Sequence, residues 1–371
     1  MAKMCQNVVL QSGKDSMFVT QTQENQVLCK VMNGLKITEE VFQLGGAVGF
    51  DAAVDKMGDI HIVMTDEKGD MIYIRKSKDR WIRGVVKENL GAENIFVFPL
   101  DKGVMIFYVS EKTLYCQKIT REIQPPYAID KTAYAGTFFV VQRENGDFLI
   151  TYINEEKREL GARRFSSKGD TWQDFQTISQ CDEVKYVFAT DHGDDILICY
   201  KAMDEIRFVK IGEGSQQSLT RRHTGRAQCP VIMTAGGGIK LCWLCDGRVF
   251  ASERKDENLR WQRLEETPIS DVEQVGIFKF CNRQISYKIG FVKNGCVGIW
   301  GEEEEKIATP KPQNTDQNKI ERIFEEIKII HSRIEELNNK IDKMKKVVMI
   351  SPSKKVVERV GRTNLVKIDK K

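Results

Sequence analysis

The residues best suited to chemistry in this sequence are two closely spaced cysteines and four histidines. Cys242 and Cys245 form the one CxxC pair, the spacing of a redox dithiol or of half a zinc site. No second CxxC completes a zinc site, and residues three apart in a β-strand point to opposite faces. The histidines, at positions 61, 192, 223 and 331, show no metal-ligand spacing. We therefore interpret the cysteine pair as packing residues and predict no metal site.

Recognised catalytic sequence patterns are also missing. The sequence has no P-loop, nucleophile elbow or dinucleotide fingerprint, and we interpret the glycine run 236–238 as a turn. Several arginines are interpreted as ordinary surface residues, namely Arg75, Arg163, Arg164 and Arg207. The sequence therefore predicts no catalytic residue and no cofactor, and it favours a binding or structural protein over an enzyme.

Composition argues against two classes of partner. The formal net charge of +4 over 371 residues is too small to favour nucleic acid. No stretch reaches the roughly 18 consecutive apolar residues of a membrane-spanning helix, and no secretory signal is recognisable. The ten cysteines are scattered, as expected for reduced thiols. We expect a cytoplasmic protein without membrane insertion, with incorporation into a larger particle left open.

The elements that carry these residues recur along the chain. Each unit has a turn rich in Gly and Asp, an apolar strand, a short turn and a second strand. The first apolar residues of the units lie 43, 44, 44, 48, 43 and 46 residues apart, at Met17, Ile60, Val104, Phe148, Ile196, Ile239 and Ile285. A period near 45 leaves room for the four short strands of one propeller blade. The sequence predicts an all-β fold, a seven-bladed β-propeller over residues 1–305.

The second unit shows the expected strands most clearly. Its four strands are predicted at Gly49–Val54, Ile60–Thr65, 71–75 and 81–86. Three tryptophans recur at the start of a predicted fourth strand, 91 and 89 residues apart, at Trp81, Trp172 and Trp261. Large rings at one blade position are expected to pack between adjacent sheets.

One turn carries a resemblance to a known family. Residues 165–172 read Phe-Ser-Ser-Lys-Gly-Asp-Thr-Trp, which resembles the Asp-box of sialidase-like β-propellers, Ser-x-Asp-x-Gly-x-Thr-Trp. Gly169, Thr171 and Trp172 match, whereas Phe165 and Ser167 replace the family's Ser and Asp. The resemblance implies a structural turn between the third and fourth strands of a blade. Sialidase catalysis would require three arginines, a tyrosine with a glutamate, and an aspartate, and none of these can be aligned.

The C-terminal region has a different pattern. A linker (306–315) precedes a heptad region (316–350) and a basic tail (351–371) that we interpret as a docking β segment or a basic arm. Apolar residues alternate in steps of three and four at Ile320, Ile323, Ile327, Ile330, Ile334, Leu337, Ile341 and Met344. This repeat predicts a coiled coil, and isoleucine at both a and d positions favours a trimer. A dimer, or a helix folded back on the propeller, is the alternative.

These features predict a non-enzymatic binding or structural protein. The coiled coil would cluster propellers, so that weak contacts with an unidentified protein or glycan add up. Two alternatives stay open. The Asp-box resemblance favours a carbohydrate-binding or glycan-processing propeller, and fold-level analogy allows a phage or spore structural component.

Overall fold

The structure is a computed structural model, and the fold is described for most of residues 7–300, which belong to one compact unit, Met1–Glu302. Short stretches inside this range are not described, namely 13–14, 23, 79, 93, 181–183, 193–194, 212–215, 220–225, 236–237, 256–260, 262–264, 269–271 and 283. The predicted linker, coiled coil and basic tail lie outside the described residues, so these three assignments stay predictions.

The regular secondary structure of the described residues consists of β-strands. Three sheets follow one another from the second repeat unit onward. The first contains β5 (Gly49–Val54), β6 (Ile60–Thr65), β7 (Met71–Ser77) and β8 (Arg80–Lys87). The second contains β9 (Ile95–Pro99), β10 (Val104–Ser110), β11 (Thr113–Ile119) and β12 (Tyr127–Asp130). The third contains β13 (Ala133–Gln142), β14 (Phe148–Asn154), β15 (Glu159–Ser166), β16 (Thr171–Trp172) and β17 (Gln176–Gln180).

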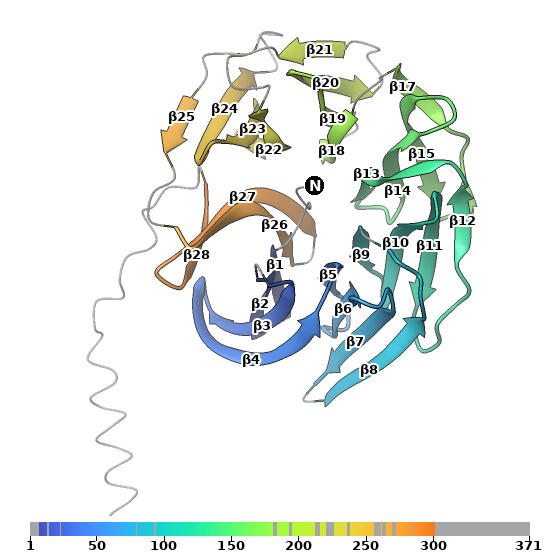
Figure 1. Cartoon of the computed structure of the whole chain (residues 1–371), viewed down its shortest axis with the longest axis vertical. Helices are drawn as coiled ribbons and strands as arrows, with labels where there is room; N and C mark the ends of the chain where they lie inside the picture. Colours follow the sequence, from blue (N-terminus) through green and yellow to red (C-terminus); the bar gives the residue numbers. More distant parts are fainter. Residues whose placement is uncertain are drawn as a thin grey trace, which may run out of the picture. The chain divides into compact units, whose positions relative to one another are not determined.

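Two further four-stranded sheets complete this series. One contains β18 (Val184–His192), β19 (Asp195–Ala202), β20 (Glu205–Ile211) and β21 (Gln216–Leu219). The other contains β22 (Gln228–Ala235), β23 (Gly238–Cys245), β24 (Arg248–Lys255) and β25 (Glu265–Pro268). Figure 1 shows the sheets arranged around a common centre, with the first strand of each sheet innermost. The chain is therefore a β-propeller, as the sequence predicted.

The predicted repeat is confirmed strand by strand. The seven apolar runs are the second strands of the units, and each strand begins within two residues of the predicted position. The predicted bounds of β5 and β6 coincide with the observed ones. The second strands are largely apolar because neighbouring sheets cover both of their faces, and all seven residues of β10 are buried.

The first and last units form one sheet, which the sequence did not predict. A closed seven-stranded barrel joins β1 (Asn7–Ser12), β2 (Asp15–Gln21), β3 (Gln26–Asn33) and β4 (Lys36–Gly46) to β28 (Cys296–Ile299), β27 (Ile285–Lys293) and β26 (Gln274–Cys281). β1 pairs with β26 in parallel, from Asn7 opposite Phe278 to Leu10 opposite Cys281. β4 meets β28 at Lys36 and Cys296. The backbone of β1 is thereby paired with that of β26, so its N–H and C=O groups are not left unpaired in the interior.

A buried ion pair reinforces this closure. Lys279 Nζ on β26 lies 2.5 Å from Asp51 Oδ2 on β5 and donates to the carbonyl of Val97 on β9 at 2.6 Å. The two charged side chains are 0% and 2% exposed. Asp51 also accepts the backbone N–H of Val97 at 2.6 Å and that of Ala52 at 2.8 Å. One lysine therefore links the inner strands of three units.

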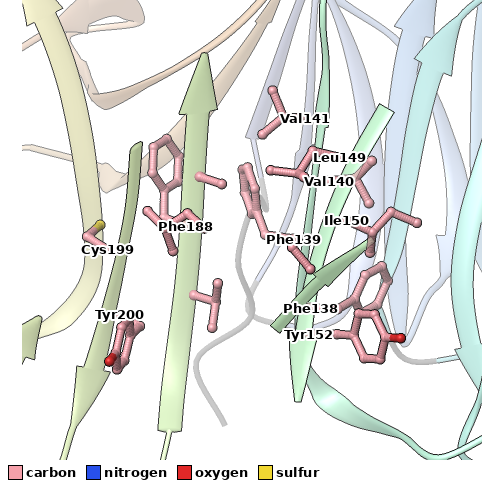
Figure 2. Packing of buried hydrophobic residues seen from close by; sticks show 14 of the residues in the cluster. Phe138, Phe139, Val140, Val141, Leu149, Ile150, Tyr152, Phe188, Cys199 and Tyr200 are labelled. Carbon is pink, nitrogen blue, oxygen red and sulfur yellow. The ribbon is translucent and has the colours of Figure 1, made fainter. Parts of the chain in front are cut away.

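Aromatic side chains fill the space between neighbouring sheets. Phe139 of β13 and Phe188 of β18 pack with ring centroids 4.7 Å apart, and Figure 2 shows them facing each other between their strands. Two tryptophans pack as predicted, because Trp172 contacts Phe107 and Trp261 contacts Phe208, each in the preceding sheet. Trp261 lies before β25 and does not open it.

Candidate functional site

A pocket opens where two turns of the third sheet meet the start of β19. Its polar lining comprises Arg143, Asp147, Arg164, Ser166 and Gln173. Its apolar lining comprises Phe148, Leu149, Phe165 and Ile196. The cavity volume is about 150 Å³, below the roughly 300–1,000 Å³ typical of sites for drug-sized molecules.

The turn between β13 and β14 places the first charged residues. Arg143 N donates to the carbonyl of Asp147 at 2.8 Å, and Gly146 N donates to the carbonyl of Arg143 at 2.9 Å. This tight turn requires a φ of +84° at Gly146, which glycine adopts readily. The turn therefore holds Arg143 and Asp147 at the pocket with little freedom.

The second turn, between β15 and β16, is fastened to the first. Asp147 Oδ1 accepts the backbone N–H and the hydroxyl of Ser167, both at 2.8 Å. Burial raises the pKa of Asp147, but the hydrogen bonds from Ser167 and Asn145 outweigh it, and the pKa lies below its ordinary value. Asp147 is therefore an anion at neutral pH, beside two cations.

The arginines differ in their contacts. Arg143 Nε lies 3.2 Å from Asp191 Oδ2, at the end of β18 in the neighbouring sheet. Arg164 Nε and Asp191 Oδ1 are buried and have no hydrogen-bond partner among the described residues. Buried polar groups usually have a partner.

The Asp-box-like turn lies beside this pocket. Phe165 pairs with Trp172 and Ser166 with Thr171, so the turn joins the third and fourth strands of its sheet, where the resemblance placed it. A Cβ on Gly169 would lie 3.1 Å from the Thr171 hydroxyl oxygen. Ser167, which stands where the family has an aspartate, donates its backbone N–H and its hydroxyl to Asp147 of the neighbouring turn.

Comparison with known proteins extends the fold assignment. No family model matches the sequence, and no curated protein matches it. The structure is similar to the BP39L lectin from Burkholderia pseudomallei, with 9% identity, a TM-score of 0.57, and coverage of 81% of this chain and 97% of that chain. It is also similar to BBS1N in complex with ARL6DN, with 11% identity, a TM-score of 0.52, and coverage of 80% and 90%.

A fungal lectin from Aleuria aurantia, described as a six-bladed β-propeller, has a TM-score of 0.45 at 11% identity, over 71% of this chain and 95% of that chain. At these identities the first two similarities show the β-propeller fold and no shared activity. The sialidase-like resemblance is not confirmed by the comparisons.

The cysteine pair is placed as the sequence predicted. Cys242 and Cys245 both lie buried in β23, and Cys242 Sγ is 3.9 Å from Met233 Sδ. The described cysteines are free thiols, and burial raises the pKa of Cys281 to about 12 and that of Cys116 to about 11. Such thiols are poor nucleophiles and poor metal ligands at neutral pH. Within the described residues no cluster of metal-binding side chains exists.

An aspartate, a histidine and a tyrosine meet in the sheet of β5 to β8. His61 Nδ1 lies 2.6 Å from the Tyr73 hydroxyl, and His61 Nε2 lies 3.2 Å from Asp55 Oδ2. His61 is fully buried, so no substrate reaches it. Asp55 also accepts the backbone N–H of Gly103 in the next sheet at 2.9 Å. This cluster joins two sheets and does not form a catalytic site.

One set of predicted residues remains to be placed. The predicted coiled-coil positions lie outside the described residues. Within the described part of the chain no helix is long and apolar enough to span a membrane.

Proposed function

We propose that this protein is a carbohydrate-binding β-propeller without catalytic activity, and that the pocket around Arg164 binds the sugar. The observation that carries the proposal is the pairing of a polar rim with an apolar floor. Arg143, Arg164 and Asp147 form the rim, and the buried rings of Phe148 and Phe165 form the floor. Sugar hydroxyls both donate and accept hydrogen bonds, and sugar C–H groups pack on apolar surface.

The contacts of the rim support this assignment. Arg143 is held by Asp191, and Asp147 is held by Ser167, so both are oriented before a ligand arrives. Preorganised groups lose little conformational entropy on binding. Arg164 brings a buried Nε without a partner among the described residues. The lectin fold of BP39L supports the proposal by analogy.

Arg164→Met should weaken sugar binding while the propeller stays folded. Methionine keeps the aliphatic stem but removes every guanidinium donor, so the affinity for any sugar bound by the native protein should fall at least about tenfold, or about 1.4 kcal/mol. A glycan array identifies the sugar, and the ligand-induced shift in melting temperature measures the loss.

Arg158→Met is the matched control, because Arg158 is an exposed arginine in the turn between β14 and β15. It should bind like the native protein. If Arg164→Met binds equally well, the pocket is not the site. If the native protein binds no glycan on the array, the proposed function fails.

We further propose that the seven repeat units are seven blades and that the heptad region assembles the propellers into a trimer. Clustering would multiply weak contacts between sugars and single pockets. The reduced state of the described thiols supports a cytoplasmic location.

Placing two carboxylates in the heptad seam with Ile327→Asp and Ile334→Asp should convert the trimer into a monomer. Charged side chains at a positions cannot make the apolar contacts that drive the association of the helices. Light scattering on the full chain measures the mass. Ser332→Asp with Asn339→Asp, at the outward f positions, is the control and should stay trimeric. A monomeric native chain would contradict the proposed assembly.

A further inference from the structure

The outer strand β8 has a long free edge, and among the described outer strands only β4, with eleven residues, is longer. Seven of the eight residues of β8 pair with β7, and no other described strand pairs with it. Among the described residues the outer strands β12, β21 and β25 have four residues each, and β17 has five. β-Propellers and other sheet proteins usually keep such edges short, because a free row of N–H and C=O groups recruits further strands.

The side chains of β8 are not those of a purely protective edge. Ile82 is 58% exposed and Val85 is 53% exposed, the two most exposed apolar side chains in the sheet of β5 to β8 apart from Met57 in a turn. Both are β-branched residues that pack well against a neighbouring strand. A partner strand would cover them.

Gly84, between these two residues, is not required by the fold. Its φ is not positive, and a Cβ added there would meet nothing within 4 Å. Glycine inside a strand weakens it by roughly 0.5–1 kcal/mol relative to alanine. Such a glycine often marks a place where another chain approaches closely. The open space at Gly84 can therefore hold a side chain of a partner.

The charge of this edge is mainly positive. Residues 78–87 contain four cations and one carboxylate, and Lys78, Arg80, Arg83 and Lys87 are exposed. No described carboxylate forms an ion pair with Arg80 or Arg83. An acidic partner is the complement of this surface.

We propose that the edge of β8 is a docking surface for an extended acidic peptide of a partner protein, which adds to the sheet as a further strand. The free N–H and C=O groups of the edge match the backbone of a further strand, and neither nucleic acid nor lipid has such a backbone. Residues alternate between the two faces of β8, so Arg80 and Ile82 lie on one face and Arg83 and Val85 on the other. A peptide with acidic and apolar side chains on each face would contact both arginines and cover both apolar residues. This surface lies on another sheet than the Arg164 pocket and is independent of the proposed sugar binding.

The test uses the full-length protein and a fluorescent peptide that repeats Glu-Glu-Val-Val, which places glutamate and valine on each face of an extended strand. We expect saturable binding that weakens as salt rises, since exposed charges are screened. A peptide of the same sequence with alternate backbone nitrogens methylated keeps the charge but loses N–H donors, and it should bind at least about tenfold more weakly.

Two variants locate the contact. Arg80→Glu with Arg83→Glu should weaken peptide binding at least about tenfold, because two attractions become repulsions. The charge-matched control, Arg121→Glu with Arg158→Glu, changes exposed arginines elsewhere and should bind normally. Gly84→Val should weaken binding without lowering the melting temperature, since the space around Gly84 is open.

Three results would overturn the proposal. The native protein does not bind the glutamate–valine peptide at 1 mM, on the order of the weakest specific contacts. The methylated peptide binds as well as its parent, which means that charge alone is recognised. A 20-base-pair DNA duplex or a phosphatidylserine vesicle binds in place of the peptide, and this binding is lost in the Arg80→Glu, Arg83→Glu variant.

Discussion

Lys279→Met should lower the free energy of unfolding by about 3–5 kcal/mol, the largest effect expected of any single substitution of a polar residue in this propeller. The lysine is fully buried and contacts Asp51 and the carbonyl of Val97. Methionine fills a similar volume but leaves the Asp51 carboxylate buried without its counter-charge. Urea denaturation measures the loss, provided that the slope of the transition is unchanged.

Two controls define the cause of this loss. Burial raises the pKa of Asp51 more than Lys279 lowers it, so Asp51 is already easier to protonate than an exposed aspartate. Adding Asp51→Asn to Lys279→Met removes the uncompensated charge and should recover part of the stability. Lys293→Met, an exposed lysine at the end of β27, should change stability by no more than about 0.5 kcal/mol. Equal effects of Lys279→Met and Lys293→Met would disprove the buried pair.

The repeat could be predicted from sequence because one strand of each unit carries the signal. The second strand lies in the middle of its sheet with both faces covered, so it forms a continuous apolar run. Runs such as β6 and β10 therefore mark the units at regular spacing. The outer strands carry no comparable signal, because their residues are largely exposed, as β8 shows.

The closure of the ring could not be predicted in the same way. β1 pairs with β26 across almost the whole sequence, and no local pattern identifies which strands meet. Lys279 gave a misleading signal. It stands between Phe278 and Phe280, and this alternation of apolar and polar residues is typical of a strand whose polar side chains face solvent. Lys279 is nevertheless fully buried, because neighbouring strands cover both faces of β26.

The pocket was missed for a related reason. The sequence interpretation placed Arg164 on the surface, but its Nε is buried. Arg143 and Asp191 lie 48 residues apart and meet because adjacent sheets present equivalent turns on one face. Spacing close to one repeat was the available signal. It identifies equivalent positions, but it does not show that their side chains converge.

Asp55→Asn should lower the free energy of unfolding at pH 7 by about 3 kcal/mol. The Asp55 carboxylate accepts the backbone N–H of Met57, Asp59 and Gly103, and the last of these bonds crosses to the next sheet. An amide cannot accept at both ends, so one buried donor loses its partner, at a cost of about 1–3 kcal/mol, together with one charge-assisted bond. Thermal or urea denaturation of both proteins measures the difference.

The same difference should depend on pH in a defined direction. Burial raises the pKa of Asp55, but the adjacent His61 and the N–H of Gly103 outweigh it, so the folded-state pKa is lowered. A lowered pKa stabilises the fold at pH values above the unfolded value of about 3.9, and this stabilisation is lost as the pH falls through the folded value. The gap between native protein and Asp55→Asn should therefore shrink below about pH 4.

Asp101→Asn provides the matched comparison, because Asp101 is 81% exposed and forms an ion pair with the exposed Lys56. Exposed ion pairs contribute at most about 1 kcal/mol, so this variant should show a small gap at every pH. A gap for Asp55→Asn that stays constant from pH 7 to pH 3 would mean that its carboxylate charge does not stabilise the contact between the sheets. A shrinking gap would show that the negative charge of one aspartate contributes to joining two sheets of the ring.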